Sequence, residues 1–210
     1  MTCIISKRPG LPMDEEAFKY YDVQIIDVMK GDTIAKYMKE ASCASFYQPC
    51  LDDFILTAEN QSTNLMARII LPDSIDSKAE RIIAEQANWV KYIGVLNVVL
   101  TPPPLTTGCD IFKLSSLLAL ILVDYPMLNI VLEMEDLKTW KSVQKCLNYD
   151  KRIYVAITFN SNNFCQWKGE PIKFCSISNT NGVEILIKYG ISIEANDLNV
   201  VRELRWQMKI

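Results

Sequence analysis

Short apolar runs alternate along the chain with longer segments in which apolar residues recur every three or four positions. The runs are too short for stable helices and are bounded by turn-forming residues, which is typical of strands buried on both faces. The clearest run is residues 95–100 (VLNVVL), which ends just before three consecutive prolines. The predicted strands are residues 22–28, 54–57, 64–71, 95–100, 129–132, 152–159, 172–177 and 191–193.

The segments with a three-to-four-residue repeat predict amphipathic helices between these strands. The strongest begins at Ser77, which forms an S-x-x-E capping box with Glu80. It ends at Gly94, a residue type that favours the left-handed turn after a helix. The other predicted helices are residues 33–41, 111–122, 136–147, 182–189 and 197–208.

This alternation of fully apolar strands with helices predicts a parallel sheet covered by helices. No G-x-G-x-x-G or P-loop motif follows the first strand, so the open nucleotide-binding sheets lack their usual signature. We therefore predict an α/β protein with a TIM-type (β/α) barrel. A full barrel takes about 250 residues, whereas this chain has 210. We expect a single domain over residues 1–210 and an incomplete barrel of about six or seven β/α units.

Charge and apolar content exclude two classes of partner. The net charge is −3 and no basic run is present, which argues against nucleic acid. No apolar run approaches the roughly 20 residues that a membrane span needs, and the N-terminus has no long apolar core typical of a secretory signal. We expect no nucleic acid partner, no membrane, and a cytoplasmic protein that also occurs in the nucleus.

The residue types present also limit the chemistry. The chain has no histidine, which excludes Ser-His-Asp triads and mixed Cys/His zinc sites. Its seven cysteines form no C-x-x-C pair. The closest pairs, Cys43 with Cys50 and Cys165 with Cys175, are interpreted as ordinary buried thiols of a reduced protein. No metal site is predicted.

Several segments are similar to a known family. Residues 167–173 (WKGEPIK) are similar to a W-x-G-E-P-I-K stretch, and residues 149–156 (YDKRIYVA) to a K-R-I-x-V-A stretch, of the type II (symmetric) protein arginine methyltransferases. Residues 53–57, 72–74, 85–94 and 179–182 match the same family in order. Between about residues 20 and 190 the chain thus resembles the N-terminal TIM-barrel domain of that protein arginine methyltransferase family.

The resemblance implies a barrel that precedes a separate S-adenosylmethionine-binding catalytic domain, docks a WD-repeat adaptor protein and takes part in homo-oligomer assembly. The chain departs from the family where a long insertion is reduced to Glu133-Met134-Glu135, and the similarity ends after Tyr189. The cofactor loop and catalytic glutamates belong to the absent domain. No catalytic, cofactor-binding or metal residue is therefore assigned, and the expected role is a non-catalytic scaffold that supports arginine methylation only when joined to that domain.

Two alternatives stay open. The first is a stand-alone TIM-barrel hydrolase or lyase, because catalytic residues of such barrels lie at the carboxyl ends of the strands and paired carboxylates perform acid–base chemistry. It requires a concave pocket around Asp27, Glu133 and Glu194. The polar residues at predicted strand ends are Asp27, Glu133, Glu135, Asn160 and Glu194. The second is a truncated product or degenerate copy with an open barrel edge.

Glu170 and the tryptophans are interpreted as structural. Pro171 forces Glu170 into an extended conformation at the start of a strand, on the face of the barrel that serves stability. Its carboxylate is expected to accept a backbone N–H or to pair with Lys168 or Lys173. Trp167 is expected to cover the barrel bottom. The tryptophans assigned to packing on helices are Trp89, Trp140 and Trp206.

Overall fold

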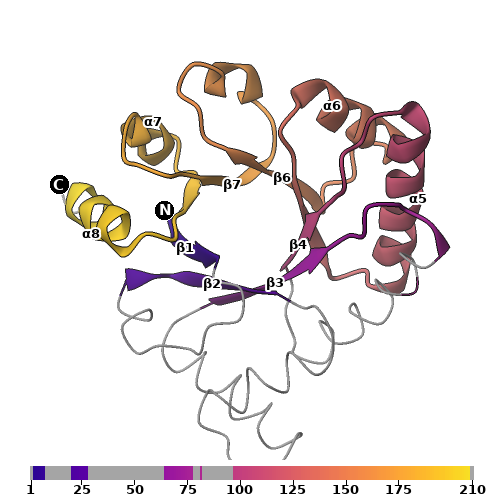
Figure 1. Ribbon diagram of the computed structural model, residues 1–210, viewed down its shortest axis with the longest axis horizontal. Coiled ribbons are helices and arrows are strands. Elements are labelled where there is room, and N and C mark those ends of the chain that lie inside the picture. Colours follow the sequence, from indigo (N-terminus) through magenta and orange to yellow (C-terminus); the bar gives the residue numbers. More distant parts are fainter. Residues whose placement is uncertain (1, 8–19, 28–63, 78–80, 82–96, 209–210) are drawn as a thin grey trace, which may run out of the picture.

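The computed structural model describes residues 2–7, 20–27, 64–77, 81 and 97–208 (Figure 1). Their strands form one closed sheet in which all neighbouring strands are parallel. The strands are β1 (Ile4–Lys7), β2 (Val23–Asp27), β3 (Asn64–Ile70), β4 (Asn97–Thr101), β5 (Asn129–Glu133), β6 (Ile153–Thr158), β7 (Ile172–Ser176) and β8 (Ser192–Glu194). The predicted α/β barrel is confirmed.

The barrel closes where the first strand meets the last. Ile4 pairs with Ile193 and Ile5 with Glu194, while the other edge of β1 pairs with β2. The sheet thus contains eight strands in the order of the sequence, more than the six or seven units predicted. The additional strand is β1, a four-residue segment to which the apolar pattern assigned no structure. The predicted strand at residues 54–57 lies outside the described residues.

The helix layer is incomplete at one position in the described part of the chain. The helices are α5 (Gly108–Asp124), α6 (Leu137–Cys146), α7 (Val183–Lys188) and α8 (Leu198–Gln207). Between β6 and β7, however, the described chain forms only the 3-10 turn η1 (Phe164–Trp167). The incompleteness expected from chain length is therefore found among the helices, whereas the sheet is closed.

Helix boundaries follow their caps. α5 begins three residues before the predicted start because Thr107 and Asp110 form a capping box in which each side chain accepts the other residue's backbone N–H. Asp136 caps α6 by accepting the N–H of Thr139 at 2.7 Å. The predicted helix at residues 33–41 lies outside the described residues, as does most of the helix predicted from Ser77.

Apolar side chains form two cores, one on each face of the sheet. Along β4, Val99 faces the barrel interior, whereas Val98 and Leu100 face the helices. The interior core consists of Ile5, Val23, Ile25, Met66, Val99, Val131, Ala156 and Phe174. This alternation explains why the strands read as continuous apolar runs, since both faces are buried.

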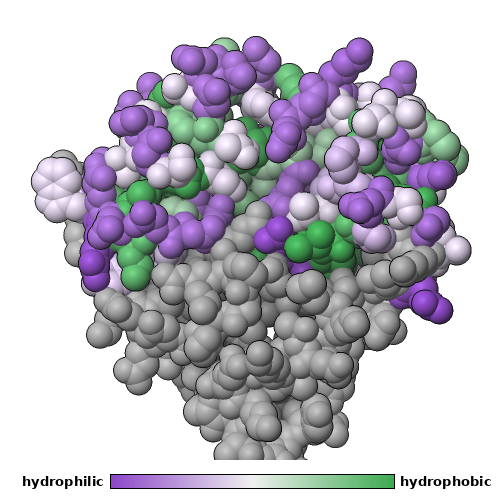
Figure 2. Space-filling model, viewed as in Figure 1, coloured by the Kyte–Doolittle hydropathy of each residue, from purple (hydrophilic) through white to green (hydrophobic). Residues whose placement is uncertain are grey.

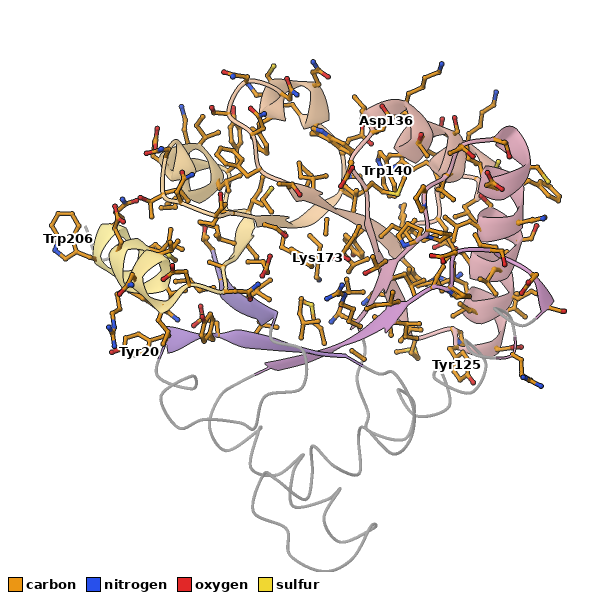
Figure 3. All side chains as sticks on the ribbon, in the orientation of Figure 1. Tyr20, Tyr125, Asp136, Trp140, Lys173 and Trp206 are labelled. Carbon is orange, nitrogen blue, oxygen red and sulfur yellow. The ribbon has the colours of Figure 1, made fainter. Side chains whose placement is uncertain are left out.

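A register shift between β6 and β7 places a lysine inside the barrel. Val155 pairs with Ile172 but Ala156 pairs with Phe174, so Lys173 is the extra residue of a bulge. The Lys173 ammonium lies 4.9 Å from the centroid of the Tyr154 ring, and Figure 3 shows its side chain directed toward the barrel centre. The bulge thus adds a cation–π contact to the floor of the barrel.

The tryptophans divide into buried and exposed residues. Trp140 is buried in the core between sheet and helices, which confirms the packing expected of it. Trp167 is buried as expected, but in this same outer core and not as a cover over the barrel bottom. Trp206 is 68% exposed and points away from α8 (Figure 3), so the packing predicted for it was wrong. The buried residues of α8 are Val201 and Leu204. Trp206 follows Leu204 by two positions, about 200° around the helix, and therefore faces outward. Trp89 lies outside the described residues.

The amino ends of the strands are held by ion pairs. Arg205 on α8 pairs with Asp22 at 2.9 Å, and Asp22 also accepts the backbone N–H of Ile4 at 2.8 Å. Arg152 pairs with Asp150 at 2.6 Å and donates to the carbonyl of Leu122 at 2.9 Å, near the end of α5. These contacts tie α8 and the end of α5 to the sheet.

We expect Asp150→Asn to destabilise the protein at neutral pH and to matter less in acid. The hydrogen bond from Arg152 holds the pKa of the Asp150 carboxyl below its ordinary value. Its contribution is therefore complete above the unfolded-state value of about 4 and is lost as the pH falls through the lower folded-state value. Urea unfolding at neutral pH and near pH 3 measures both. Lys151→Gln, an exposed charge in the same turn, is the control. An equal Asp150→Asn effect at both pH values would contradict the assignment.

Candidate active site at the carboxyl ends of the strands

A cavity of about 530 Å³ opens at the carboxyl ends of strands β3 to β7. This size is within the usual range for small-molecule sites. The loop after β4 contributes apolar residues, and the rest of the lining, from β3 to β7 and the start of α6, is mixed polar and apolar. The lining residues are Arg68, Thr101, Pro102, Pro103, Pro104, Leu105, Glu133, Met134, Glu135, Asp136, Thr139, Ala156, Ile157, Thr158 and Ser176.

Three side chains from consecutive strands are linked inside the cavity. Arg68 of β3 donates from Nε to Thr101 Oγ1 at 3.0 Å, and the Thr101 hydroxyl of β4 donates to Oε2 of Glu133 on β5. Arg68 Nε also lies 3.8 Å from that carboxylate oxygen. The side chains of Arg68 and Glu133 are only 15% and 17% exposed. The Glu133 carboxylate is thus oriented by two groups on rigid strands, partly shielded from water.

The strand register explains this arrangement. Val99 pairs with Val131, so Thr101 and Glu133, each two residues further along, are neighbours on the inward face. Arg68 projects from the same face of β3, beside Val99. Inward positions near the carboxyl ends of parallel strands converge on the mouth of a barrel, which is where catalytic residues of such barrels are found.

The predicted strand-end residues are only partly brought together. Glu133 and Glu135 both line the cavity, Glu133 half-buried and Glu135 exposed. Glu194 is 4% exposed at the end of β8 and is not among the residues that line this cavity. The side chain of Asp27 lies outside the described residues. The cavity thus contains Glu133 but not Glu194, and the part of the predicted pocket at Asp27 stays a prediction.

Asn160 does not belong to the cavity. Its side chain is exposed and accepts the N–H of Asn162 at 3.0 Å, while its carbonyl accepts the N–H of Phe164 at 2.9 Å. Asn160 thus forms the turn that leads into η1. The start of α6 is capped by Asp136, and the hydrogen bond from Thr139 lowers the pKa of the Asp136 carboxyl.

The sequence interpretation missed Arg68, Thr101, Thr158 and Ser176, all of which line the cavity. A signal for Arg68 was present, because a lone charge within the apolar run of residues 64–71 is unusual. Thr101 was marked by its place between a buried strand and three prolines. Thr158 and Ser176 carried no comparable signal, because hydroxyl residues are common at strand ends.

Glu170 is structural, as predicted, but its partners differ from those expected. Its carboxylate accepts the indole N–H of Trp140 at 2.8 Å and pairs with Lys141, both on α6. We had expected a backbone N–H, Lys168 or Lys173. Trp140 (Figure 3) is buried, so the hydrogen bond satisfies an indole donor in the outer core. Glu170 thus ties the start of β7 to α6.

The described residues offer no metal site, and their cysteines differ in burial. They contain no group of three or more potential metal ligands. Burial raises the pKa of the Cys175 thiol to about 12, which confirms it as a buried, unreactive thiol. Cys165 is exposed, so the prediction that it is buried was wrong. Cys43 and Cys50 lie outside the described residues. None of the described helices combines the length and the apolar composition needed to cross a membrane.

Comparison with known proteins identifies the fold but no family. No family model and no curated protein matches the chain. A fungal endo-beta-N-acetylglucosaminidase of glycosyl hydrolase family 18 matches with a TM-score of 0.62 and 12% identity, over 95% of this chain and 92% of that chain. N-acetylneuraminate lyase from Fusobacterium nucleatum matches with a TM-score of 0.57 and 13% identity, over 93% of this chain and 68% of that chain.

A third match is the 4-hydroxy-tetrahydrodipicolinate synthase of Methylacidiphilum fumariolicum, with a TM-score of 0.52 and 13% identity, over 96% of this chain and 69% of that chain. At such identities these similarities establish the fold alone. They also overturn the resemblance to protein arginine methyltransferases, because the matching structures are a glycosidase, a lyase and a synthase. The chain is a TIM barrel.

Local packing explains parts of the two segments that resembled that family most specifically. Trp167 is buried, Glu170 binds α6, and Pro171 precedes β7, so the W-x-G-E-P pattern meets the needs of one loop. In residues 149–156, Arg152 is placed by its ion pair with Asp150. The scaffold role, the WD-repeat adaptor and the link to S-adenosylmethionine followed from the resemblance alone and lose their support with it.

Proposed function

We propose that this barrel is an acid–base enzyme, a hydrolase or lyase, in which Glu133 transfers the proton. The observation that supports this most is the Arg68–Thr101–Glu133 arrangement, which orients a half-buried carboxylate in a cavity of small-molecule size. Its place at the carboxyl ends of the strands is the usual location of catalytic groups in this fold. The solved barrels with this fold include a glycosidase and a lyase, in keeping with the proposal.

The roles of the three residues follow from their contacts. The Thr101 hydroxyl and Arg68 approach Oε2 of Glu133, so they fix the direction in which the carboxylate faces the cavity. Glu133 then takes a proton from water or from the substrate and returns it to the leaving group. The guanidinium of Arg68 balances negative charge that develops next to it. Thr101 thus acts as a positioning residue, whereas Arg68 both orients Glu133 and stabilises charge on the reacting atoms.

Hydrolysis requires the Glu135 carboxylate, whereas carbon–carbon cleavage does not. Hydrolysis of a glycosidic bond uses two carboxylates on either side of the bond, for which Glu133 and Glu135 are the two glutamates lining this cavity. In a lyase, Glu133 alone removes the proton of the substrate hydroxyl, and the carbon–carbon bond breaks to leave a carbonyl and an enolate. Arg68 stabilises the enolate oxygen, and Glu133 returns the proton to the enolate carbon. Glu135→Gln therefore separates the two reactions, because it abolishes the first and leaves most of the second.

The proposal is tested by offering the chain substrates of both kinds. One set contains chromogenic glycosides of N-acetylated amino sugars, and the other contains N-acetylneuraminate and related 2-keto acids, whose cleavage releases pyruvate. We expect turnover within one set, at a rate that depends on Glu133. The exposed Glu184 on α7 provides a matched control, Glu184→Gln. Turnover that survives Glu133→Gln would contradict the assignment, and so would a lack of turnover in both sets combined with a lack of ligand binding at the cavity.

A further inference from the structure

Helix α5 carries an apolar stripe on its outer face, opposite its buried side. Phe112, Leu120 and Val123 are 67%, 57% and 77% exposed, and Met127, just beyond the helix, is 77% exposed. Ser116 and Ala119 lie between them on the same face and are also exposed. The stripe therefore consists of residues 112, 116, 119, 120, 123 and 127. Figure 2 shows hydrophobic surface at the edge of the molecule where α5 lies in Figure 1.

The stripe is larger than the barrel needs for its own packing. The buried side of α5 already fills the outer core with Leu114, Leu117, Leu118, Ile121 and Leu122. Four large apolar side chains, each more than half exposed, present roughly 400–500 Å² in one patch, a size typical of the largest patch on a monomer, which is often functional. With its rim, such a patch approaches the ~800 Å² per partner of a specific interface.

We propose that this face binds a second copy of the same chain, with the two α5 helices antiparallel about a two-fold axis. Charge favours this occupant. Lys113 lies near the start of α5 and Asp124 at its end, and neither forms an ion pair among the described residues. They are eleven positions apart, about three turns, so both project from the same edge of the stripe. A two-fold axis across the helices places Lys113 of each copy beside Asp124 of the other.

The shape of the stripe fits the same arrangement. Ser116 and Ala119 are small and lie near the middle of the 17-residue helix, where the two axes would cross. Small residues at a crossing let helices approach to about 8 Å. Leu120 of one copy then fits between Ser116 and Ala119 of the other, and Phe112 packs on the other copy's Val123. Each contact occurs twice, as a two-fold interface requires.

Sedimentation equilibrium of the whole chain over a range of micromolar concentrations tests the proposal. We expect the mass to rise from 24.0 kDa toward twice that value for the wild type and to remain at 24.0 kDa for Leu120→Lys. The exposed Trp206 on α8 supplies the matched control, because Trp206→Lys adds the same charge away from the stripe and should dimerise as the wild type does. Circular dichroism verifies that each variant is folded.

A charge exchange tests the antiparallel pairing. Lys113→Glu or Asp124→Lys alone places like charges together twice per dimer, and we expect about a tenfold weaker dimer from each, or about 1.4 kcal/mol. The double variant restores the opposite charges and should regain wild-type affinity. A wild type that remains monomeric, including one that binds lipid vesicles instead, would overturn the proposal. A dimer insensitive to Leu120→Lys, or a double variant that is not rescued, would overturn it too.

Discussion

Replacing Glu133 by Gln is expected to lower kcat/KM by about 10²–10⁴-fold, the usual contribution of one acid–base group. Gln keeps the size of the side chain and still accepts the hydrogen bond from Thr101, so the cavity should retain its shape. What it loses is the proton that Glu133 exchanges. Steady-state kinetics on the substrate found with the two sets above measures the change, and a KM near that of the wild type would show that binding is preserved.

Two further variants show whether the lower kcat/KM of Glu133→Gln comes from the loss of its proton transfer. Glu184→Gln removes an exposed carboxylate from α7, and we expect its kcat/KM to equal that of the wild type. Arg68→Gln removes the guanidinium beside Glu133 and should shift the pH–rate profile in addition to lowering the rate. A Glu133→Gln enzyme with more than half of the wild-type rate would remove Glu133 from the mechanism.

Trp140→Ala is expected to cost about 3–5 kcal/mol of unfolding free energy, the usual cost of deleting a fully buried large aromatic. Trp140 is fully buried in the outer core, and its indole N–H is donated to Glu170. The substitution therefore leaves a cavity and also removes a hydrogen bond from a carboxylate whose side chain is only 7% exposed. Urea denaturation followed by circular dichroism measures the loss.

Trp206→Ala is the matched control, because it deletes the same side chain where it is exposed. We expect its effect to remain within about 0.5 kcal/mol. Trp140→Phe retains most of the volume but not the indole donor, so its cost isolates the hydrogen bond to Glu170. Equal costs for Trp140→Ala and Trp206→Ala would show that α6 is not packed as described.

The sequence predicted the barrel because its strands are buried on both faces. Val98, Val99 and Leu100 are all buried, two against the helices and one in the barrel interior, and such strands give continuous apolar runs. β1 escaped prediction because its four residues are defined by pairing with β2 and β8, which are distant in sequence. Closure of the sheet therefore depends on long-range strand pairing, which a local sequence pattern does not predict.

The site was predictable to the extent that strand ends could be located. Glu133 was found because β5 ends there, whereas Asn160 was placed among the candidates because the end of β6 was set one residue too late. The connection from Glu133 through Thr101 to Arg68 depends on the pairing register of β3, β4 and β5. A single sequence does not specify that register. The methyltransferase resemblance failed because it used short local motifs, and the most specific of them, W-x-G-E-P, is explained by the packing of the loop before β7.

A crystal structure of the chain with a bound substrate analogue tests the central claim most directly. The account predicts that the analogue occupies the cavity between the proline loop and β5, with its reacting atom within hydrogen-bond distance of the Glu133 carboxylate. An analogue bound elsewhere, with Glu133 still held by Thr101 and Arg68 and touching no ligand atom, would contradict it.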